Sequence, residues 1–437
     1  MGLKIEYSDK QLSPWGGLAL MKEMLDKSGI RTQLSSIGLP ESTSNNSIEA
    51  LTIVESFFAS VWIGATAFAQ TGIVRLDHTI KEIFGWKRVP SGTTMGRFFK
   101  KFSWKENNRV FAAMNQWFFN QVKLSNYTLD VDSSVITRYG SQQGSVPGYN
   151  PTKQGRCSHH PLFAFISELR RVANCWLRSG NTASASNCLE FLEETFHILK
   201  DKTIGLFRAD AGFASNSIFE FLEKENIPYV IASRMHAVMQ QKIKEIKNWV
   251  AIGEGVWIAE IEYKAGKWNK ARRVVVTRQD IQIRPKATGK KLRLFNDDLY
   301  YQNHRFHCFI TNQSLPAQQI WQQYKGRADA ENRIQELKYD FALEGFSMKE
   351  FYATEAAMRF ITIAYNLMSL YKHVTTQTTV HQRLHTIRIN CFAVGGWIVK
   401  QGNKRILKLA VRKEKRPWMD GLLKLVRDVG MPLSLKT

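Results

Sequence analysis

Residues 128–136 carry the sequence TLDVDSSVI, whose alternation of apolar and polar residues decides the fold class. Leu129 and Val131 alternate with Asp130 and Asp132, which is the two-residue period of a β-strand. Because successive side chains of a strand point to opposite faces, the two aspartates share one face. The stretch therefore predicts a strand that ends in a pair of carboxylates.

The elements that follow this stretch come in an order typical of an α/β protein. Apolar runs predict strands over 161–168, 171–180, 203–210 and 228–233, and amphipathic segments predict helices over 189–199 and 216–227. Three strands, then helix, strand, helix and strand, favour a core with a mixed sheet. The fold class expected is α/β.

A second strand-rich block follows the core, over about 250–311. Its sequence GVWIAEIEYKAGKWNKARRVVVTRQD contains two alternating runs separated by Ala265-Gly266-Lys267, which predicts a hairpin. Helix returns at Ala317 and continues past Asp340. No low-complexity linker separates the block, so it is expected to be inserted into the core. The predicted regions are 1–122 (helical), 123–235 (core, first part), 236–314 (β-rich insertion), 315–372 (core, second part) and 373–437 (basic, helical).

The helical region 1–122 contains a pattern typical of a helix-turn-helix. Asp77 is placed to cap a short helix that stops at Gly85, and Pro90-Ser91 opens a second helix. The second helix carries three cations, Arg97, Lys100 and Lys101. Contact with DNA through these cations and an ordinary helical hairpin with a solvated basic face are equally compatible with the pattern.

The composition restricts the class of protein. The chain has 437 residues, 44% of them hydrophobic, so it can bury a sizeable core and wholesale disorder is excluded. The formal net charge of +23 points to a polyanionic partner, nucleic acid first, although ribosome-associated and membrane-surface proteins share such charge. Five cysteines without a C-x-x-C pair argue against a disulfide scaffold or a zinc ribbon. We expect an intracellular protein without a secretory signal or membrane span.

Chemistry on nucleic acid usually requires divalent metal, and Mg²⁺ prefers oxygen ligands. Asp130 and Asp132 supply such oxygens at the end of the first strand. Asp210 supplies another at the end of the strand over 203–210, and the small residues Ala211 and Gly212 leave room beside it. A strand-end aspartate is more often a cap or turn residue, so the argument depends on these acids occurring together.

A third acid is expected from the helix after the insertion, whose sequence over 324–340 is YKGRADAENRIQELKYD. It offers four acids: Asp329, Glu331, Glu336 and Asp340. At about 100° per residue, one narrow stripe contains Tyr324, Arg327, Glu331 and Lys338. Only Glu331 among the acids joins this stripe. A carboxylate amid a phenol, a guanidinium and an ammonium suits a metal ligand beside phosphate-binding groups, although mixed-charge helix faces are usually solvated ion pairs.

Over roughly residues 70–370 the sequence resembles bacterial insertion-sequence transposases of the DDE class. The resemblance lies in the order Asp–Asp–Glu, the string ADAGF around Asp210, and the spacing Tyr324-x2-Arg327-x3-Glu331-x6-Lys338. The strings LDVDSSV, GYNPTKQGR and RSGNT are similar to further strings of one branch of this subgroup, which also has a strand-rich insertion before the third acid.

The resemblance implies a ribonuclease-H-like core that binds two Mg²⁺ ions, for which Mn²⁺ can substitute, through Asp132, Asp210 and Glu331. It implies hydrolysis at transposon ends and transfer of the exposed 3′-hydroxyl into target DNA. The implied partners are double-stranded DNA, as terminal inverted repeats and target, and a second copy of the chain in the synaptic complex. The implied location is the bacterial cytoplasm, at the nucleoid. By resemblance, DNA phosphate is contacted by Tyr324, Arg327 and Lys338.

Some assignments stay open at this point. Asp132, followed by Ser133-Ser134, fits the family pattern as the first acid, and Asp130 is the second choice. Trp257 and Trp268 are candidates for stacking on a flipped base, and the alternative is that they belong to the sheet core. Two other functions remain: a ribonuclease-H-like nuclease or resolvase without strand transfer, and a DNA-binding protein that lost catalysis.

Overall fold

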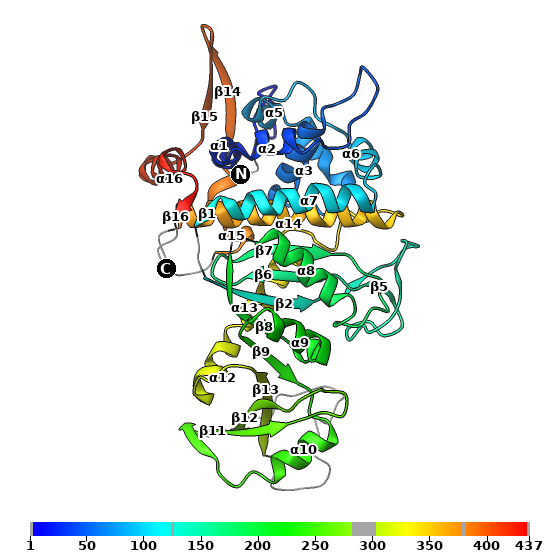
Figure 1. Cartoon of the computed structure of the whole chain (residues 1–437). Coiled ribbons are helices and arrows are strands. Elements are labelled where there is room, and N and C mark those ends of the chain that lie inside the picture. Colours follow the sequence, from blue (N-terminus) through cyan, green and yellow to red (C-terminus); the bar gives the residue numbers. More distant parts are fainter. Residues whose placement is uncertain (1–2, 124–125, 201, 282–302, 377–381, 435–437) are drawn as a thin grey trace.

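The structure is a computed structural model that describes residues 3–123, 126–200, 202–281, 303–376 and 382–434. Its centre is a nine-stranded mixed sheet in the order β10-β11-β12-β13-β9-β8-β2-β6-β7 (Figure 1). The five core strands are β2 (Asn126–Ser133), β6 (Leu162–Ile166), β7 (Arg171–Trp176), β8 (Thr203–Ala209) and β9 (Tyr229–Ser233).

Strand directions in this core give the ribonuclease-H-like arrangement. β2 pairs antiparallel with β6, and β6 pairs antiparallel with β7. On its other side β2 pairs parallel with β8, and β8 pairs parallel with β9. Helices α8 (Cys188–Ile198) and α9 (Asn216–Lys224) lie in the connections between β7 and β8 and between β8 and β9. The α/β class with a mixed sheet is confirmed.

The β-rich segment extends the same sheet. β13 (His304–Thr311) pairs antiparallel with β9, so the outer edge of the core is continued by the inserted strands. The other strands of the segment are β10 (Val250–Gly253), β11 (Val256–Tyr263) and β12 (Arg272–Asp280), beside the helix α10 (Ala237–Lys244). β11 and β12 form the hairpin predicted around Ala265-Gly266-Lys267.

A group of helices covers the core on the side away from the β-rich segment (Figure 1). The long helix α14 (Phe351–Thr375) lies between the sheet and an outer group of helices, and almost its whole length is buried (Figure 1). Burial on all sides explains why most of its sequence is apolar, and its buried charged residues Glu355 and Arg359 pair with each other. The outer group comprises α1 (Ala19–Ser28), α2 (Ile30–Ser36), α3 (Ala50–Ile63), α4 (Gly72–Leu76), α5 (His78–Phe84), α6 (Gly92–Phe99) and α7 (Trp104–Asn120).

Alternation along the strands divides the core between the two faces of the sheet. On β6, Phe163 and Phe165 face the cluster formed with α3, α7 and α14, whereas Leu162 and Ala164 face the cluster formed with α8 and α9. Both faces are therefore covered, as the continuous apolar strand sequences require.

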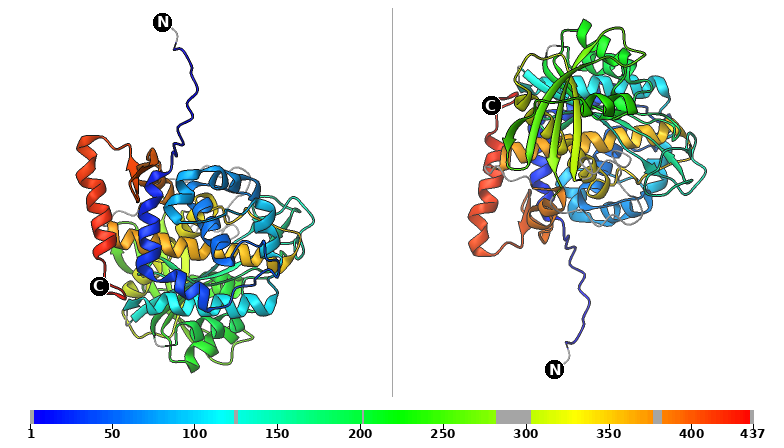
Figure 2. Two further views of the ribbon diagram at one scale, coloured as in Figure 1. Left: turned by 90° about the horizontal axis from the view of Figure 1, so that it is seen from above. Right: turned by 90° about the horizontal axis from the view of Figure 1, so that it is seen from below.

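Two features differ from the sequence-based expectation. The helix expected from Ala317 past Asp340 is two helices, α12 (Ala317–Lys325) and α13 (Ala328–Tyr339). The C-terminal region contains, besides α15 (Leu384–Ile387) and α16 (Arg416–Asp428), a hairpin of β14 (Gly396–Gln401) and β15 (Lys404–Leu409) that the sequence did not predict. Figure 2 shows α16 lying alongside α1.

The apolar helices α3 and α14 are largely buried. Within the described ranges, no single helix is long and apolar enough to cross a membrane. Ala50–Ile63 and Phe68–Leu76 pass by length and composition only when they are joined, and they are bent by 101°.

Candidate active site

The pairing of β2 with β8 brings two of the predicted acids together. Val131 pairs with Ala209 in the parallel ladder, so the next residues, Asp132 and Asp210, lie beside each other at the carboxyl ends of the strands. Asp132 is buried, and its Oδ1 accepts the Ser133 amide hydrogen at 2.8 Å. Asp210 Oδ1 accepts from the Gly212 amide at 2.8 Å. One oxygen of each carboxylate is thereby oriented by backbone.

The alternative first acid, Asp130, is engaged elsewhere. It pairs with Arg208 across the same ladder, and both residues are buried. Its two oxygens accept from Arg208 Nε at 2.6 Å and Nη2 at 2.8 Å. A bidentate pair of this kind occupies the carboxylate that a metal would need. The structure therefore places Asp132, and not Asp130, beside Asp210 with an oxygen available to the helix above.

Arg208 also supports the junction between α12 and α13. Its Nη1 donates to the Gln323 carbonyl at 2.6 Å, near the end of α12. A Cβ at Gly326 would lie 2.4 Å from the same nitrogen, so only glycine allows the junction to approach the guanidinium. The buried Asp130–Arg208 pair thus positions the segment that carries the third acid.

Arg327 and Glu331 lie on this segment, directly over the strand ends. Arg327 Nη2 lies 3.0 Å from Asp132 Oδ2, and Arg327 Nη1 lies 3.0 Å from Glu331 Oε1. One guanidinium therefore joins the acid of β2 to the acid of α13. The Glu331 side chain is 62% exposed, which leaves it accessible from solvent.

The other three acids of the helical segment have structural partners. Glu336 is buried, and its Oε1 accepts from Lys372 Nζ at 2.7 Å. Asp340 forms a bidentate pair with Arg383, and Asp329 is paired with Arg333 on the next turn. Only Glu331 of the four acids contacts the strand-end cluster, as the helix-face argument predicted.

Burial and neighbouring charges shift the pKa values of Asp132 and Tyr324. Burial is the main cause that raises the pKa of Asp132 to about 7; Arg327 opposes this shift, and Asp210 and Glu331 add to it. Burial also raises the pKa of Tyr324, which is influenced by the same arginine and the same three acids. A cluster of coupled carboxylates with a pKa near neutrality is typical of a functional site.

The carboxylates have the donor chemistry of a divalent-cation site, but a guanidinium lies among them. Within the described ranges, no group of three His, Cys, Asp or Glu side chains is arranged to hold a metal ion. The Arg327 guanidinium lies between Asp132 and Glu331 and pairs with both of them. Carboxylates converging on one cation fit Mg²⁺ chemically, provided that Arg327 moves aside.

Comparison with known families identifies the chain. Residues 2–429 match the family described as transposase DDE domain, group 1. The chain belongs to this DDE transposase family. Enzymes of this class generally use divalent metal ions, which agrees with the carboxylate chemistry of the site.

Solved structures and curated proteins provide two further comparisons for this DDE transposase domain. Among solved structures, the chain is similar to one titled "Cryo-EM structure of piggyBac transposase synaptic complex with hairpin DNA", with a TM-score of 0.46 and 10% sequence identity. That similarity covers 85% of this chain and 78% of the other. The search of curated proteins found no match.

Two members of the predicted stripe flank the acids of the transposase domain. The Tyr324 ring packs against Phe309, with ring centroids 4.5 Å apart. Lys338 Nζ donates to the Val135 carbonyl at 2.7 Å and pairs with Glu344 at 3.0 Å. Lys338 therefore holds the loop that follows β2 in place, and its ammonium group is only partly available to a ligand.

The other predicted contact residues lie away from the acids. Arg97 is exposed on α6, whereas Lys100 pairs with Glu350 at 3.0 Å and Lys101 donates to the Glu41 carbonyl at 2.8 Å. Asp77 and Ser91 cap α5 and α6 as predicted. The helix pair thus exists, and two of its three cations hold neighbouring segments of the same chain.

The two candidate stacking tryptophans have different environments. The Trp268 indole is buried among Phe219 and Tyr263, so it belongs to the core, which was the alternative interpretation. Trp257 is half-buried, and the Arg278 guanidinium lies 4.5 Å from its ring centroid. Trp268 would have to leave the core to stack on a base.

Sequence reasoning did not assign a role to the loop over 177–187, which borders the acids. Arg178 is buried and its Nη1 donates to three carbonyls of this loop, that of Ser184 at 3.1 Å among them. Ser184 Oγ lies 3.1 Å from Ser133 Oγ, next to Asp132. A Cβ at Gly212 would lie 2.9 Å from Ser184 Cβ. The string RSGNT was the available signal, but its spacing alone specified no contact.

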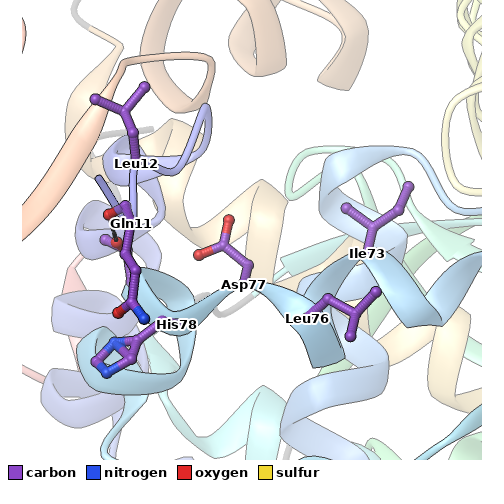
Figure 3. Close-up of a pocket in the computed structure, with 7 residues that line it drawn as sticks. Gln11, Leu12, Ile73, Leu76, Asp77 and His78 are labelled. Carbon is purple, nitrogen blue, oxygen red and sulfur yellow. Dashed lines mark hydrogen bonds between the residues drawn. The ribbon is translucent and has the colours of Figure 1, made fainter. Parts of the chain in front are cut away.

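A hollow of about 300 Å³ lies at another place, beside the N-terminal segment (Figure 3). Gln11 and Leu12 line it on one side, and Ile73 and Leu76 on the other, with Asp77 between them. None of the predicted metal or DNA ligands lines this hollow.

Proposed function

We propose that the protein is the transposase of an insertion sequence, which cuts DNA at the transposon ends and joins the exposed 3′-hydroxyl to target DNA. One observation carries the proposal: Asp132, Asp210 and Glu331, from two strand ends and one helix, are coupled around a single guanidinium on a ribonuclease-H-like sheet. Membership of the DDE transposase family supports it.

In this proposal Asp132, Asp210 and Glu331 hold two Mg²⁺ ions, for which Mn²⁺ can substitute. Bound divalent cations supply an activated water and stabilise the leaving oxygen in phosphodiester chemistry. The chain contributes orientation. The Ser133 and Gly212 amides fix one oxygen of each aspartate, and the second oxygen of Asp132 faces Arg327.

DNA phosphate is the proposed partner of Arg327, Tyr324 and Lys338. With the acids engaged by a divalent cation, Arg327 would lose its carboxylate partners and its guanidinium would be free to pair with a DNA phosphate. Arg327 thus changes from a partner of carboxylates to a partner of DNA. Tyr324 and Lys338 border the same acids and complete a polar rim around the scissile bond.

The proposed substrate is double-stranded DNA that carries the terminal inverted repeats, followed by target DNA. The net charge of +23 supports a polyanionic partner such as duplex DNA. Two copies of the chain are proposed to act together, one at each end, in the cytoplasm of a bacterial cell, at the nucleoid.

The test uses purified protein, Mg²⁺ and a labelled DNA fragment that contains one inverted repeat from the DNA flanking the gene. We expect cleavage at the repeat and joining of the label to a plasmid. Asp210→Ala and Glu331→Gln are expected to abolish both steps while the variants still bind the fragment. Asp329→Asn, on the same helix as Glu331 but paired with Arg333, is the matched control and should retain activity.

The outcomes separate the alternatives. Cleavage without joining would identify a nuclease or resolvase. Binding without cleavage, unchanged by Asp210→Ala, would identify a DNA-binding protein that lost catalysis. Activity that survives Glu331→Gln and disappears in Asp329→Asn would contradict the assignment of the third acid.

A further inference from the structure

The hairpin of β14 and β15 projects from the helical end of the molecule, opposite to the end that carries the β-rich segment (Figure 1). Its strands are joined by the two residues Gly402 and Asn403, since Gln401 pairs directly with Lys404. Gly402 has φ +59°, and its position faces open space, as a tight two-residue turn at a free tip requires. The ribbon therefore ends in solvent.

The hairpin and the turn after it are strongly basic. Residues 396–416 contain eight lysines and arginines and a single acid, Glu414, which gives a local net charge of +7. The cations are Lys400, Lys404, Arg405, Lys408, Arg412, Lys413, Lys415 and Arg416. The hairpin and the turn after it thus concentrate positive charge in a short stretch of the chain.

The strand register places cations on both faces of the tip. Lys400 lies directly opposite Arg405 on one face, and Gln401 lies opposite Lys404 on the other. Like charges directly opposite each other destabilise an isolated hairpin, and Glu82 on α5 balances the charge of one of the two residues, Arg405. An anionic partner at the tip would relieve the repulsion.

The base of the hairpin is fixed to the body. Gly396 and Ser13 exchange two backbone hydrogen bonds of 2.8 Å each. Gly16 packs against Gly396 so closely that a Cβ would lie 2.9 Å from the Gly396 Cα. Arg405 is paired with Glu82 on α5, the first helix of the predicted helix-turn-helix. The hairpin is therefore held firmly against the body and projects beside α5, the first helix of the basic pair.

We propose that the β14–β15 hairpin is a DNA-binding arm that inserts into a groove of duplex DNA and contacts the phosphates on both sides. A two-stranded antiparallel ribbon has the width that the major groove admits, and cations on both faces match the two phosphate walls. This arm rests on the proposed DNA substrate but not on the catalytic residues. It holds DNA at a distance from the acids and is independent of base sequence.

The test measures binding of a fluorescent DNA duplex by anisotropy at several salt concentrations, without metal. The variant replaces Lys400, Lys404, Arg405 and Lys408 by glutamine. Each lost phosphate contact should reduce the slope of log K against log salt by about 0.9, so loss of four contacts gives a reduction of about 3 to 4. At low salt we expect binding at least about tenfold weaker.

The matched control removes the same charge at the other end of the molecule, by replacing Lys224, Lys247, Lys264 and Lys267, all exposed, by glutamine. Its slope should change by less than about 1. A milder pair, Lys400→Gln with Lys404→Gln, keeps the Arg405–Glu82 contact and tests the tip if the fourfold variant does not fold. This pair should reduce the slope by about 2.

Equal changes of the salt slope in the hairpin and control variants would show that only net charge determines DNA binding. That result would overturn the proposal that the hairpin is a DNA-binding arm. An unchanged slope in a folded hairpin variant would do the same while the cleavage function stands. Failure of the unmodified protein to bind any duplex would overturn the proposed DNA-cleaving function as well.

Discussion

The two aspartates of β2 should differ sharply when each is replaced by asparagine. Asp130 is buried and accepts both hydrogen bonds of the Arg208 fork, at 2.6 and 2.8 Å. Asp130→Asn would leave a buried guanidinium without its counter-charge. Breaking a buried pair in this way costs about 3–5 kcal/mol. Arg208 keeps its bonds to the Gln323 carbonyl and to Ser167, so we expect about 3 kcal/mol.

Asp132→Asn should have a much smaller effect on stability. Burial raises the pKa of the Asp132 carboxyl to about 7, so its ionised form gains little from the folded environment near neutral pH. Asparagine replaces it at nearly the same volume, and Arg327 retains Glu331. The expected change in unfolding free energy is below about 1 kcal/mol.

The assay is urea unfolding followed by tryptophan fluorescence, without metal, combined with DNA cleavage at a temperature where both variants are folded. Asp130→Asn should be destabilised yet cleave DNA, whereas Asp132→Asn should be stable and inactive. The reverse result, a stable and inactive Asp130→Asn beside a destabilised and active Asp132→Asn, would refute the assignment of the first acid.

Three further substitutions follow from the same contacts. Gly326→Ala should destabilise the protein by about 1–3 kcal/mol in the same urea assay, because a Cβ would lie 2.4 Å from the fixed Arg208 Nη1; an unchanged midpoint would show that the junction can shift. Lys338→Ala should slow cleavage more than it weakens binding, since Lys338 holds the Val135 carbonyl beside the acids; equal losses in both assays would argue against that role. Burial lowers the pKa of His159 to about 4, below its ordinary value of 6.5, so stability should be lost as pH falls from 6.5 toward 4, and His159→Gln should flatten this part of the stability–pH curve.

Much of the core was predictable because local patterns and packing agree. The alternation in TLDVDSSVI and the apolar runs over 161–168 and 203–210 are buried strands in the structure, as predicted. The helix-face argument placed Glu331 on one stripe with Arg327, and in the structure Arg327 contacts both Glu331 and Asp132, although α12 and α13 are separate helices. Arg327 and Glu331 remain one turn apart and in contact.

Other features depend on contacts between distant residues and left no periodic signal. The strand alternation does not distinguish Asp130 from Asp132, and only the resemblance to the family pattern favoured Asp132; in the structure the two differ because β8 places Arg208 opposite Asp130. The C-terminal hairpin lies in a region that was predicted as mostly helical, and its base is held by backbone hydrogen bonds to Ser13 and Gly16, which are far away in the sequence. Trp268 likewise owes its burial to α9 and to Tyr263, which the sequence does not place beside it.

The central claim is that Asp132, Asp210 and Glu331 share divalent cations once Arg327 withdraws. The most direct test is a crystal structure of the protein with a DNA duplex and Mn²⁺, with anomalous scattering used to locate the metal. We expect anomalous peaks bounded by oxygens of these three acids, and Arg327 turned from Asp132 toward a DNA phosphate. Peaks absent from this position, with Arg327 still joining Asp132 to Glu331, would contradict it.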